Sequence, residues 1–351
     1  MQRRLCYISR CYRNAESAGS KAKSDYETVL RSMGAVNLGL PISFHNNKVV
    51  AFLLNLIGIG LLVLRLQKGD ILFLQYPVKK YFVFLCQFAR FRKASSIVFI
   101  HDLGSFRRGK VKVPKEIKKL MNADYLIAAN TAMRSWLLDH GYSHPVGVMG
   151  FHDYLADSSP KDSPSLEPTN ITVAYAGGLA KRKNSFLEQL SHQSFSYKLL
   201  LYGNNKDLEL CDNKNIIRHP FMKDTDFIEK VQANFGLIWD GDSLDECSGP
   251  WGEYLKYNSP HKASFYIRAG LPLIIWRCAA LAPLVEEEGI GILIDSLQEL
   301  DHILKDMTSE RYEKMIENIS RVNAQISNGQ CLKNALQKAM ESFNQSEKTV
   351  H

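Results

Sequence analysis

Two potential cations, His261 and Lys262, lie where the sequence predicts the start of a helix. They follow Asn258, Ser259 and Pro260; proline suits the first helical turn, where its missing N–H costs nothing, and Asn258 or Ser259 is expected to cap that turn. Cations beside the positive end of a helix dipole destabilise a purely structural helix. A bound anion would remove that cost, so this segment predicts a diphosphate site.

A second anion-binding pattern follows a strand predicted near residue 175. Gly177 and Gly178 allow the backbone to approach a phosphate, and Lys181, Arg182 and Lys183 come directly after them. Arginine holds a phosphate with two parallel hydrogen bonds, whereas lysine acts as a point charge. A solvated run of charges after a turn is the alternative. No G-K-[ST] follows, so the segment is not a Walker A loop.

A weaker pattern places Gly19 and Ser20 between the first predicted strand and a helix that we expect to begin at Lys21. A glycine turn before a helix offers backbone N–H groups to an anion, although many such turns bind nothing. The turn is not G-x-G-x-x-G, which argues against a nicotinamide dinucleotide.

Asp102 is the first candidate for a general base, because it follows the strand predicted at 96–100. A carboxylate at the carboxyl end of a strand could take a proton from an acceptor hydroxyl. Basic residues between 90 and 119 would help to hold a charged acceptor, and they would also lower the basicity of this carboxylate. His101 is the second candidate. A structural Asp that caps the loop remains the alternative.

The chain gives little reason to expect a metal ion or a disulfide. It has no H-E-x-x-H and no Cys/His cluster, and the D-x-D pair Asp240 and Asp242 comes late in the chain. The seven cysteines form no C-x-x-C pair. We expect reduced thiols in a cytoplasmic protein, since no apolar leader precedes the first predicted strand.

Predicted strands and helices alternate twice along the chain. In the first half the strands fall at 5–9, 36–40, 71–76, 96–100, 125–129 and 146–149, and the helices at 21–33, 48–66, 81–91 and 132–140. In the second half the strands fall at 171–175, 198–202, 216–219, 235–239, 273–276 and 292–294, with clear helices at 261–269 and 297–305 and a last helical region at 310–344. This alternation predicts parallel sheets covered by helices on both faces.

A loop rich in proline and serine, 153–168, separates the two series. We therefore expect an α/β protein of two Rossmann-like, doubly wound domains, 1–160 and 161–351, facing a cleft. The sequence leaves open whether the last helix packs back on the first domain. Ligands of such sheets lie beyond the carboxyl ends of the strands.

Charge is uneven between the halves. Residues 1–165 carry 24 Lys and Arg against 11 Asp and Glu, whereas residues 166–351 carry 20 against 25. The basic half would attract the phosphates of nucleic acid, of anionic lipid headgroups or of a pyrophosphate-linked acceptor, and a merely solvated basic face is the alternative. The apolar run 51–64 is too short to cross a bilayer, so we expect a buried helix there.

The segment 252–264, which contains Asn-Ser-Pro-His-Lys, and the Ala-Gly-Leu-Pro that follows at 269–272 resemble a known family. It is the bacterial β-1,6-galactofuranosyltransferase family, which is related to the GT-B glucosyltransferases that extend glycans on serine-rich adhesins. Ala-Gly-Ser-Lys-Ala-Lys at 18–23 and His-Asp-Leu at 101–103 also match stretches typical of that group. The matches extend over nearly the whole chain.

The resemblance implies a GT-B fold, a UDP-sugar donor held mainly by the C-terminal domain, and transfer without a metal cofactor. Carried over by position, Arg182 would bind the pyrophosphate, the Gly19–Ser20 turn would cover the donor, and Asp102 would be the base. The remaining donor-binding candidates are Gly178, Tyr257, Asn258, His261 and Lys262.

The expected reaction is transfer of a hexosyl group, galactofuranosyl first and glucosyl next, to a glycan or lipid-pyrophosphate-linked acceptor in cell-surface polysaccharide assembly. Peripheral contact with the inner membrane face through the basic domain fits such an acceptor, and a homo-oligomer is left open. A basic nucleic-acid-binding protein and a catalytically idle scaffold of glycan assembly are the rival interpretations. We expect no nucleic-acid partner, because nucleic-acid binding gives no reason for two Rossmann-like units.

Overall fold

A computed structural model of the chain describes residues 3–12, 18–78, 80–107, 111–161, 164–205 and 207–349. The chain divides into two compact units. Unit 1 comprises Met1–Asp153 and Asn328–His351, and unit 2 comprises Tyr154–Ser327.

Unit 1 is built on a six-stranded, all-parallel sheet with the order β3-β1-β5-β6-β7-β8. Its strands are β1 (Leu5–Tyr7), β3 (Val36–Asn37), β5 (Ile71–Tyr76), β6 (Ser95–Ile100), β7 (Tyr125–Ala128) and β8 (Val146–Val148). From β1 the chain passes to β3 on one side and then to β5 on the other, so the order reverses between β1 and β5. The central strands β5, β6 and β7 are almost wholly buried, as expected of a sheet covered on both faces.

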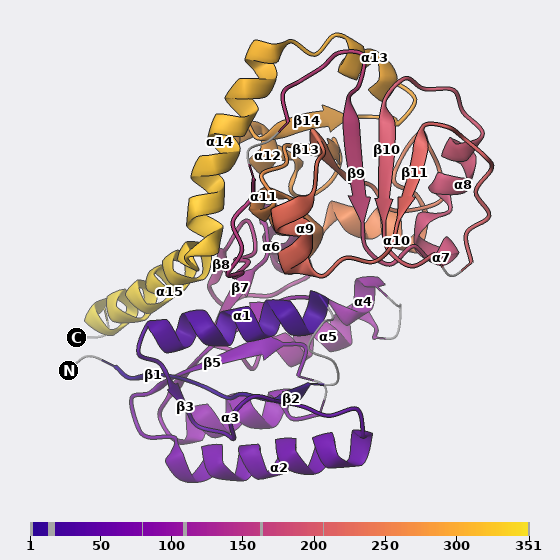
Figure 1. Ribbon diagram of the computed structural model, residues 1–351. Coiled ribbons are helices and arrows are strands. Elements are labelled where there is room, and N and C mark those ends of the chain that lie inside the picture. The colour runs from indigo at the N-terminus through magenta and orange to yellow at the C-terminus, as the bar shows by residue number, and fades with distance from the viewer. Residues whose placement is uncertain are drawn as a thin grey trace. The chain divides into compact units, whose positions relative to one another are not determined.

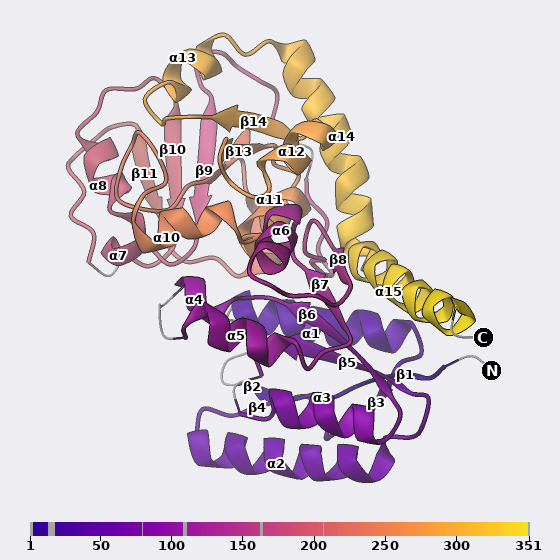
Figure 2. The ribbon, with the colours of Figure 1, turned by 180° about the vertical axis from the view of Figure 1, so that it is seen from behind.

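Helices cover both faces of this sheet. They are α1 (Ala18–Ser32), α2 (Lys48–Arg65), α3 (Phe82–Phe91), α4 (Gly104–Arg107), α5 (Val113–Leu120), α6 (Thr131–Asp139) and α15 (Gln330–Thr349). Figures 1 and 2 show α2 and α3 side by side on one face of the sheet, with α1 on the other. Two further short strands, β2 (Cys11–Tyr12) and β4 (Ser43–Phe44), pair in parallel outside the main sheet.

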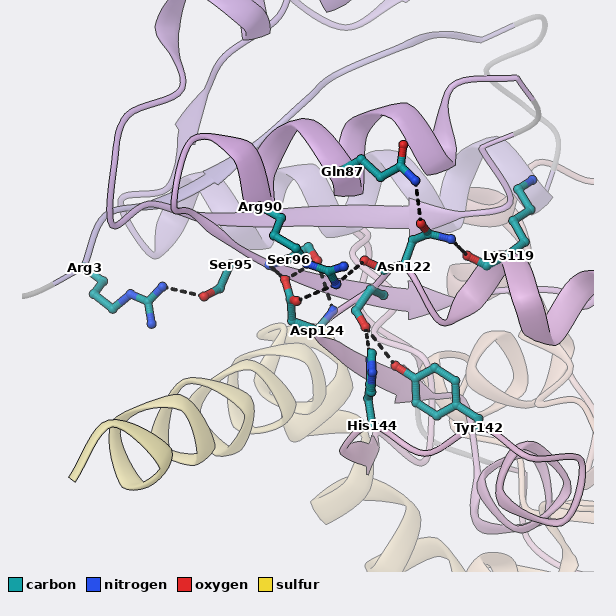
Figure 3. A network of polar contacts seen from close by, with 11 residues as sticks. Arg3, Gln87, Arg90, Ser95, Ser96, Lys119, Asn122, Asp124, Tyr142 and His144 are labelled. Atoms are coloured by element: carbon teal, nitrogen blue, oxygen red, sulfur yellow. Dashed lines mark hydrogen bonds and ion pairs between the residues drawn. The ribbon is translucent and has the colours of Figure 1, made fainter. Parts of the chain in front are cut away.

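A polar network fastens the amino ends of β6 and β7 (Figure 3). The Asp124 carboxylate accepts hydrogen bonds from the backbone N–H and the hydroxyl of Ser96, at 2.8 and 2.7 Å, and pairs with Arg90 at 3.2 Å. The carbonyl of Ala123 accepts from the ring of His144 at 2.7 Å. These bonds lie at the end of the sheet away from the strands' carboxyl ends, so they support the sheet and leave the ligand edge open.

Unit 2 repeats the architecture with the order β11-β10-β9-β12-β13-β14, again all parallel. Its strands are β9 (Thr172–Ala176), β10 (Lys198–Tyr202), β11 (Ile216–His219), β12 (Phe235–Ile238), β13 (Leu273–Trp276) and β14 (Gly291–Ile294). Its helices are α7 (Lys181–Asn184), α8 (Phe186–Ser191), α9 (Asp224–Lys230), α10 (Gly249–Gly252), the 3-10 helix η1 (Glu253–Lys256), α11 (His261–Arg268), α12 (Ala282–Glu288), α13 (Leu300–Lys305) and α14 (Ser309–Ser327).

The last predicted helical region, 310–344, is in fact two helices. α14 ends at Ser327 and α15 begins at Gln330, with Gly329 between them at a φ of +71°. Only glycine adopts such a backbone without strain. α14 belongs to unit 2 and α15 to unit 1, so the chain passes between the units here for a second time.

The prediction of a buried helix at 51–64 is wrong in its burial. α2 is apolar on two faces, and only 17% of its residues are buried. Ile59 and Leu62 are among these buried residues. Among the described residues it is also the one helix whose 18 residues and mean hydropathy of 2.0 would allow a membrane crossing by length and composition. The length of an apolar run and its interruptions at Asn55, Gly58 and Gly60 do not show whether the fold covers one face of the helix or both.

Asp153 holds the start of α15 within unit 1. This wholly buried carboxylate accepts hydrogen bonds from the backbone N–H groups of Cys331, at 3.1 Å, and Leu332, at 2.8 Å. The first N–H groups of a helix have no partner inside the helix, so a side chain of this kind stabilises the helix start.

We predict that Asp153→Ala loosens α15, because two buried N–H groups lose their partner. The loss of about 1.4 kcal/mol for such a cap corresponds to roughly tenfold faster amide hydrogen exchange in residues 331–345. Hydrogen-exchange mass spectrometry measures this, with the exposed Asp157→Ala as the control. Unchanged exchange in α15 would show that the helix does not depend on this cap.

Candidate active site

The strand order of the unit 2 sheet reverses between β9 and β12, since the chain adds β10 on one side of β9 and β12 on the other. The loop after β9 begins at Gly177, and Asp240 lies two residues after the end of β12. Open parallel sheets bind their ligands beyond the carboxyl ends of the strands at such a reversal. Two of the segments predicted to bind a diphosphate, the 177–183 turn and the start of α11, meet at this point.

The glycine loop after β9 is shaped by close backbone packing. Gly177 has a φ of +139°, and a Cβ added at Gly203 would lie 2.1 Å from the Gly177 carbonyl oxygen. Gly178 is exposed, and a Cβ there would meet nothing within 4 Å. The Asn184 amide donates to the Gly178 carbonyl at 2.8 Å. The loop is therefore held by Gly203 and Asn184 on one side, and the space beside Gly178 is open. A phosphate-binding turn needs such an open side.

Lys183, Asp240 and Lys262 form a lysine–aspartate cluster beside this loop. The Lys183 ammonium lies 3.2 Å from one carboxylate oxygen of Asp240, and the Lys262 ammonium lies 3.8 Å from the other. The Lys262 ammonium also lies 3.8 Å from the centre of the Tyr175 ring, a cation–π contact. Two ammonium groups thus share one carboxylate, and the cluster has an excess of positive charge.

Lys262 is the most perturbed cation of the cluster. Its side chain is only 14% exposed. Burial lowers the pKa of Lys262 to about 7, Asp240 opposes this shift and Lys183 adds to it. Burial disfavours the charged form of an amine. An anion placed against this group would restore the charge, which is the electrostatic property expected of a diphosphate site.

Arg182 lies at the mouth of the same site. Its guanidinium lies 5.5 Å from the centre of the Trp251 ring, and the Lys183 ammonium lies 5.8 Å from the same ring. No role for Trp251 follows from the sequence alone, because its contacts with Arg182 and Lys183 join positions 69 and 68 residues apart. The indole of Trp251 therefore lies beside both cations.

The start of α11 differs in detail from the sequence prediction. His261 and Lys262 are its first residues, as predicted, but Pro260 is the N-cap, and neither Asn258 nor Ser259 caps the helix. The helix start has no side-chain cap hydrogen bond, and the N–H of Ala263 bonds the Pro260 carbonyl at 2.9 Å. The positive end of a helix dipole can attract an anion. Within the described part of the chain, the Asn258 Oδ1 is buried without a hydrogen-bond partner.

Two of the remaining predicted donor residues are near the same helix. The His261 ring packs 4.9 Å from that of Tyr154, and Tyr257 is half-buried at the end of η1. The structure therefore brings six predicted residues to one region of unit 2, namely Gly178, Arg182, Tyr257, Asn258, His261 and Lys262. Their roles stay predictions.

The candidate bases lie in unit 1, after β6. The Gln75 amide group donates to the Lys23 carbonyl at 3.2 Å, so its Oε1 faces His101 and accepts from the His101 Nε2–H at 2.8 Å. The neutral His101 ring therefore has Nδ1 as its proton-accepting nitrogen. Asp102, the next residue, is half-buried.

His101 belongs to an aromatic cluster that fixes its ring. The ring of His152 is parallel to it at 6.0 Å, and those of Phe99 and Tyr26 lie 4.7 and 5.0 Å away. The Tyr26 hydroxyl bonds His152 Nδ1 at 2.7 Å. Sequence reasoning missed His152, which lies 51 positions from His101.

A small cavity in unit 1 lies at the reversal between β1 and β5. Two cations, Arg10 and Lys23, lie in its wall with three polar or aromatic side chains, Tyr12, Gln75 and Tyr81. The wall is completed by the amide of Asn55 and by five apolar side chains, Ile8, Ile59, Leu74, Val78 and Leu85. No sequence pattern signals this cavity, because its lining comes from α1, α2, α3, β2, β5 and the loops beside them.

The Gly19–Ser20 turn is part of a helix. α1 begins at Ala18, so Gly19 and Ser20 lie in its first turn, whereas the sequence predicted a helix start at Lys21. Gly19 is exposed and Ser20 is buried. The contribution of these residues to donor binding stays a prediction, and residues 13–17 lie outside the described part of the chain.

The D-x-D pair is used in other contacts. Asp240 pairs with two lysines, and Asp242 accepts a hydrogen bond from the Ser248 hydroxyl. Within residues that the structure describes, no group of three or more His, Cys, Asp or Glu is placed to hold a metal ion.

Comparison with known families decides the assignment. Residues 5–151 match the N-terminal domain, and residues 173–339 the C-terminal domain, of the glucosyltransferase 3-like proteins. The chain belongs to this family. It is 29% identical over 337 residues to the β-1,6-galactofuranosyltransferase WbbI of Escherichia coli K12, covering 93% of this chain and 95% of WbbI. It is 24% identical to glucosyltransferase 3 of Streptococcus gordonii, covering 70% of each chain.

Solved structures support the fold. The lipopolysaccharide outer core galactosyltransferase WaaB matches with a TM-score of 0.57 at 14% identity, over 96% of this chain and 99% of WaaB. The glycosyltransferase WaaG, involved in lipopolysaccharide biosynthesis, matches with a TM-score of 0.52 at 12% identity, over 94% of this chain and 98% of WaaG. The predictions of a GT-B fold with two Rossmann-like domains, of the family and of a glycosyltransferase enzyme are confirmed.

We predict that the lowered pKa of Lys262 makes stability depend on pH. The unfolded chain keeps this lysine charged up to about pH 10.5, whereas the folded protein releases the proton near pH 7. Stability therefore rises with pH between these values. We expect the difference in free energy of unfolding, wild type minus Lys262→Met, to increase by about 1.4 kcal/mol per pH unit.

Urea unfolding of both proteins at several pH values above neutrality measures this gain. Lys256→Met serves as the control, because the hydrogen bond to Glu253 raises the pKa of this half-buried lysine. A difference between wild type and Lys262→Met that stays constant with pH would show that Lys262 keeps an ordinary pKa.

Proposed function

We propose that this glucosyltransferase 3-like protein transfers a hexosyl group from a UDP-sugar to a glycan or lipid-linked oligosaccharide in cell-surface polysaccharide assembly. A galactofuranosyl group is the first candidate and a glucosyl group the second. The names of the relatives support this order, since the chain covers 95% of the galactofuranosyltransferase WbbI and 70% of a streptococcal glucosyltransferase 3.

The observation that carries the proposal is the positive cluster at the reversal of the unit 2 sheet. Lys262, Lys183 and Arg182 surround an open glycine loop and an uncapped helix start. In the proposed reaction the bond between the anomeric carbon and the β-phosphate oxygen breaks, and negative charge grows on the departing UDP. Preorganised cations and helix N–H groups stabilise that charge. The buried Asn258 Oδ1 is a candidate acceptor for a donor hydroxyl or for the uracil N–H.

The acceptor hydroxyl must lose a proton as its oxygen bonds the anomeric carbon. Asp102 is the first candidate base from the sequence. The contacts in unit 1 favour His101 instead, because Gln75 and the packed rings fix its orientation and leave Nδ1 as the basic nitrogen. We therefore propose His101 as the base, with Asp102 as the alternative.

The acceptor is proposed to bind unit 1 near the cavity that Arg10 and Lys23 line. These cations suit an acceptor that carries phosphate, such as a lipid-pyrophosphate-linked glycan. A cytoplasmic protein in peripheral contact with the inner membrane face would meet such an acceptor. Nothing in the described contacts favours nucleic-acid binding over this assignment.

We predict that UDP raises the melting temperature, that GDP, ADP and NAD do not, and that magnesium or EDTA leaves the UDP shift unchanged. Lys262→Met should weaken UDP binding at least tenfold and lower kcat/KM by about 10²-fold, because the lost charge faces the leaving group. Lys256→Met, on the neighbouring η1, should behave as the wild type.

Differential scanning fluorimetry, calorimetry and donor turnover measure these effects. Equal UDP affinity in wild type and Lys262→Met would remove Lys262 from the donor site. UDP binding without turnover on any UDP-sugar and acceptor would favour the scaffold.

We predict that His101→Ala lowers kcat by about 10²-fold or more and leaves the Kd for UDP unchanged, because proton transfer and not donor binding is lost. Asp102→Asn should lower kcat by less. Gln75→Leu, which removes the partner of Nε2 and the donor to the Lys23 carbonyl, should shift the pH dependence of kcat. Steady-state kinetics across pH test all three, and a larger loss in Asp102→Asn than in His101→Ala would return the role of base to Asp102.

A further inference from the structure

α2 presents an apolar stripe to the outside of unit 1. Val49, Leu53, Leu56, Ile57 and Leu64 are all exposed and recur at the spacing of one helix face. Leu53 and Ile57 are 50% and 54% exposed, and Leu64 is 80% exposed. Soluble proteins seldom leave an apolar stripe four turns long uncovered, so this face has a partner.

The opposite face of α2 is fastened to unit 1, so the helix lies on the domain. Ile59 and Leu62 are buried, and the Asn55 Oδ1 accepts from the backbone N–H of Cys11 at 3.0 Å. A Cβ added at Gly58 would lie 3.6 Å from the backbone nitrogen of Leu40. A helix held along its length in this way can lie in a bilayer surface, but it would have to leave its domain to cross one.

The neighbouring helix α3 extends the apolar surface. Phe84 and Phe91 are exposed, and both pack against Phe88, with ring centres 5.9 and 6.2 Å apart. Phe52 of α2 lies 6.5 Å from Tyr81, at the start of α3, so the two helices share one surface. Figures 1 and 2 show them side by side from opposite directions. Aromatic side chains of this kind suit the boundary between headgroups and acyl chains.

The charge around the stripe identifies the partner. Residues 34–101 contain eight Lys and Arg and a single acidic residue, Asp70. Asp70 is buried and paired with Arg4 at 2.6 Å. α5, which packs on α3, adds the exposed Lys112, Lys115 and Lys118. Its one carboxylate, Glu116, is buried and accepts from the Tyr76 hydroxyl at 2.7 Å.

We propose that α2 is an interfacial membrane helix, whose stripe of Val49, Leu53, Leu56, Ile57 and Leu64 inserts among the acyl chains of an anionic bilayer. Lys48 at its start and Lys68 beyond its end contact the lipid phosphates, and their stems lie along the apolar layer. The stripe would enter to a depth of about 5–10 Å. Pairing this face with a second copy would bring the cations of both copies together, whereas anionic lipids neutralise them.

The inference deepens the proposed peripheral membrane contact by naming the element that makes it. It also gives a reason for the position of the candidate acceptor cavity, because α2 contributes Asn55 and Ile59 to the wall of that cavity. A lipid-linked acceptor held in the bilayer beside α2 would therefore be close to Arg10 and Lys23.

Co-sedimentation with vesicles tests the proposal on the full-length protein. We expect binding to phosphatidylcholine vesicles that contain about 30% phosphatidylglycerol, weaker binding to phosphatidylcholine alone, and a fraction that stays bound at high salt. Leu53→Glu/Ile57→Glu should lower the partition coefficient about tenfold or more, since it places two charges on the inserted face. Leu64→Glu, at the most exposed position, should lower it in the same direction.

The matched control is Leu138→Glu/Phe221→Glu, which removes two exposed apolar side chains and adds the same charge outside the stripe. It should bind vesicles as the wild type does. Circular dichroism and UDP-induced stabilisation, measured on every variant, separate loss of membrane binding from loss of folding and from failure of the donor site.

Three results would overturn the proposal. One is wild-type protein that binds no anionic vesicles at low salt. Another is an equal loss in Leu53→Glu/Ile57→Glu and in the control. The third is a wild-type oligomer, seen by analytical ultracentrifugation without lipid, that Leu53→Glu/Ile57→Glu converts to monomers while neither protein binds vesicles; the stripe would then be an interface between copies.

Discussion

The contact on which the rest of the account depends is the burial of the Lys262 ammonium over the Tyr175 ring, 3.8 Å from a carboxylate that it shares with Lys183. One carboxylate does not neutralise two ammonium groups, and burial makes the imbalance costly. A chain selected only for stability would place an apolar residue at position 262. The glycine loop and the start of α11, which has no side-chain cap, meet beside these cations at the reversal of strand order. We propose that a diphosphate binds there.

Unit 1 meets a different constraint. The same sheet holds the candidate base and the cavity at the carboxyl ends of its strands, and it carries the exposed apolar face of α2 on one side. The network around Asp124 fixes the amino ends of the strands. The Lys23–Gln75–His101 chain of hydrogen bonds and the Arg10 cavity lie toward the carboxyl ends. One face of α2 lines the cavity, and the other is apolar and exposed. This division explains why the helix is apolar on two faces.

Much of the fold could be predicted from the sequence, because long β-rich runs in parallel sheets are buried on both faces and carry a strong local signal. β5, β10, β11 and β13 have the predicted bounds. Short elements such as α7, α9 and β2 were not located from the sequence, since two to seven residues hold too little periodicity. The helix start at His261 was predicted from proline chemistry, although Pro260 is the cap itself.

The parts of the candidate site that escaped prediction are those that depend on contacts between distant residues. Trp251 beneath Arg182, Tyr175 beneath Lys262, and Gln75 beside His101 each follow from packing across separate strands and loops. The exposure of α2 escaped for a related reason, because hydrophobicity measures how much a residue prefers burial and does not say whether the fold or a partner buries it.

Calorimetry of UDP binding at pH 8, in buffers of different ionisation enthalpy, tests the central claim most directly. Free protein with a Lys262 pKa of about 7 holds mostly neutral lysine at that pH, and a diphosphate would restore the charge. The account predicts uptake of close to one proton per UDP bound, lost in Lys262→Met. UDP binding with no proton uptake, or uptake that survives in Lys262→Met, would contradict the claim that the diphosphate is held by this buried lysine.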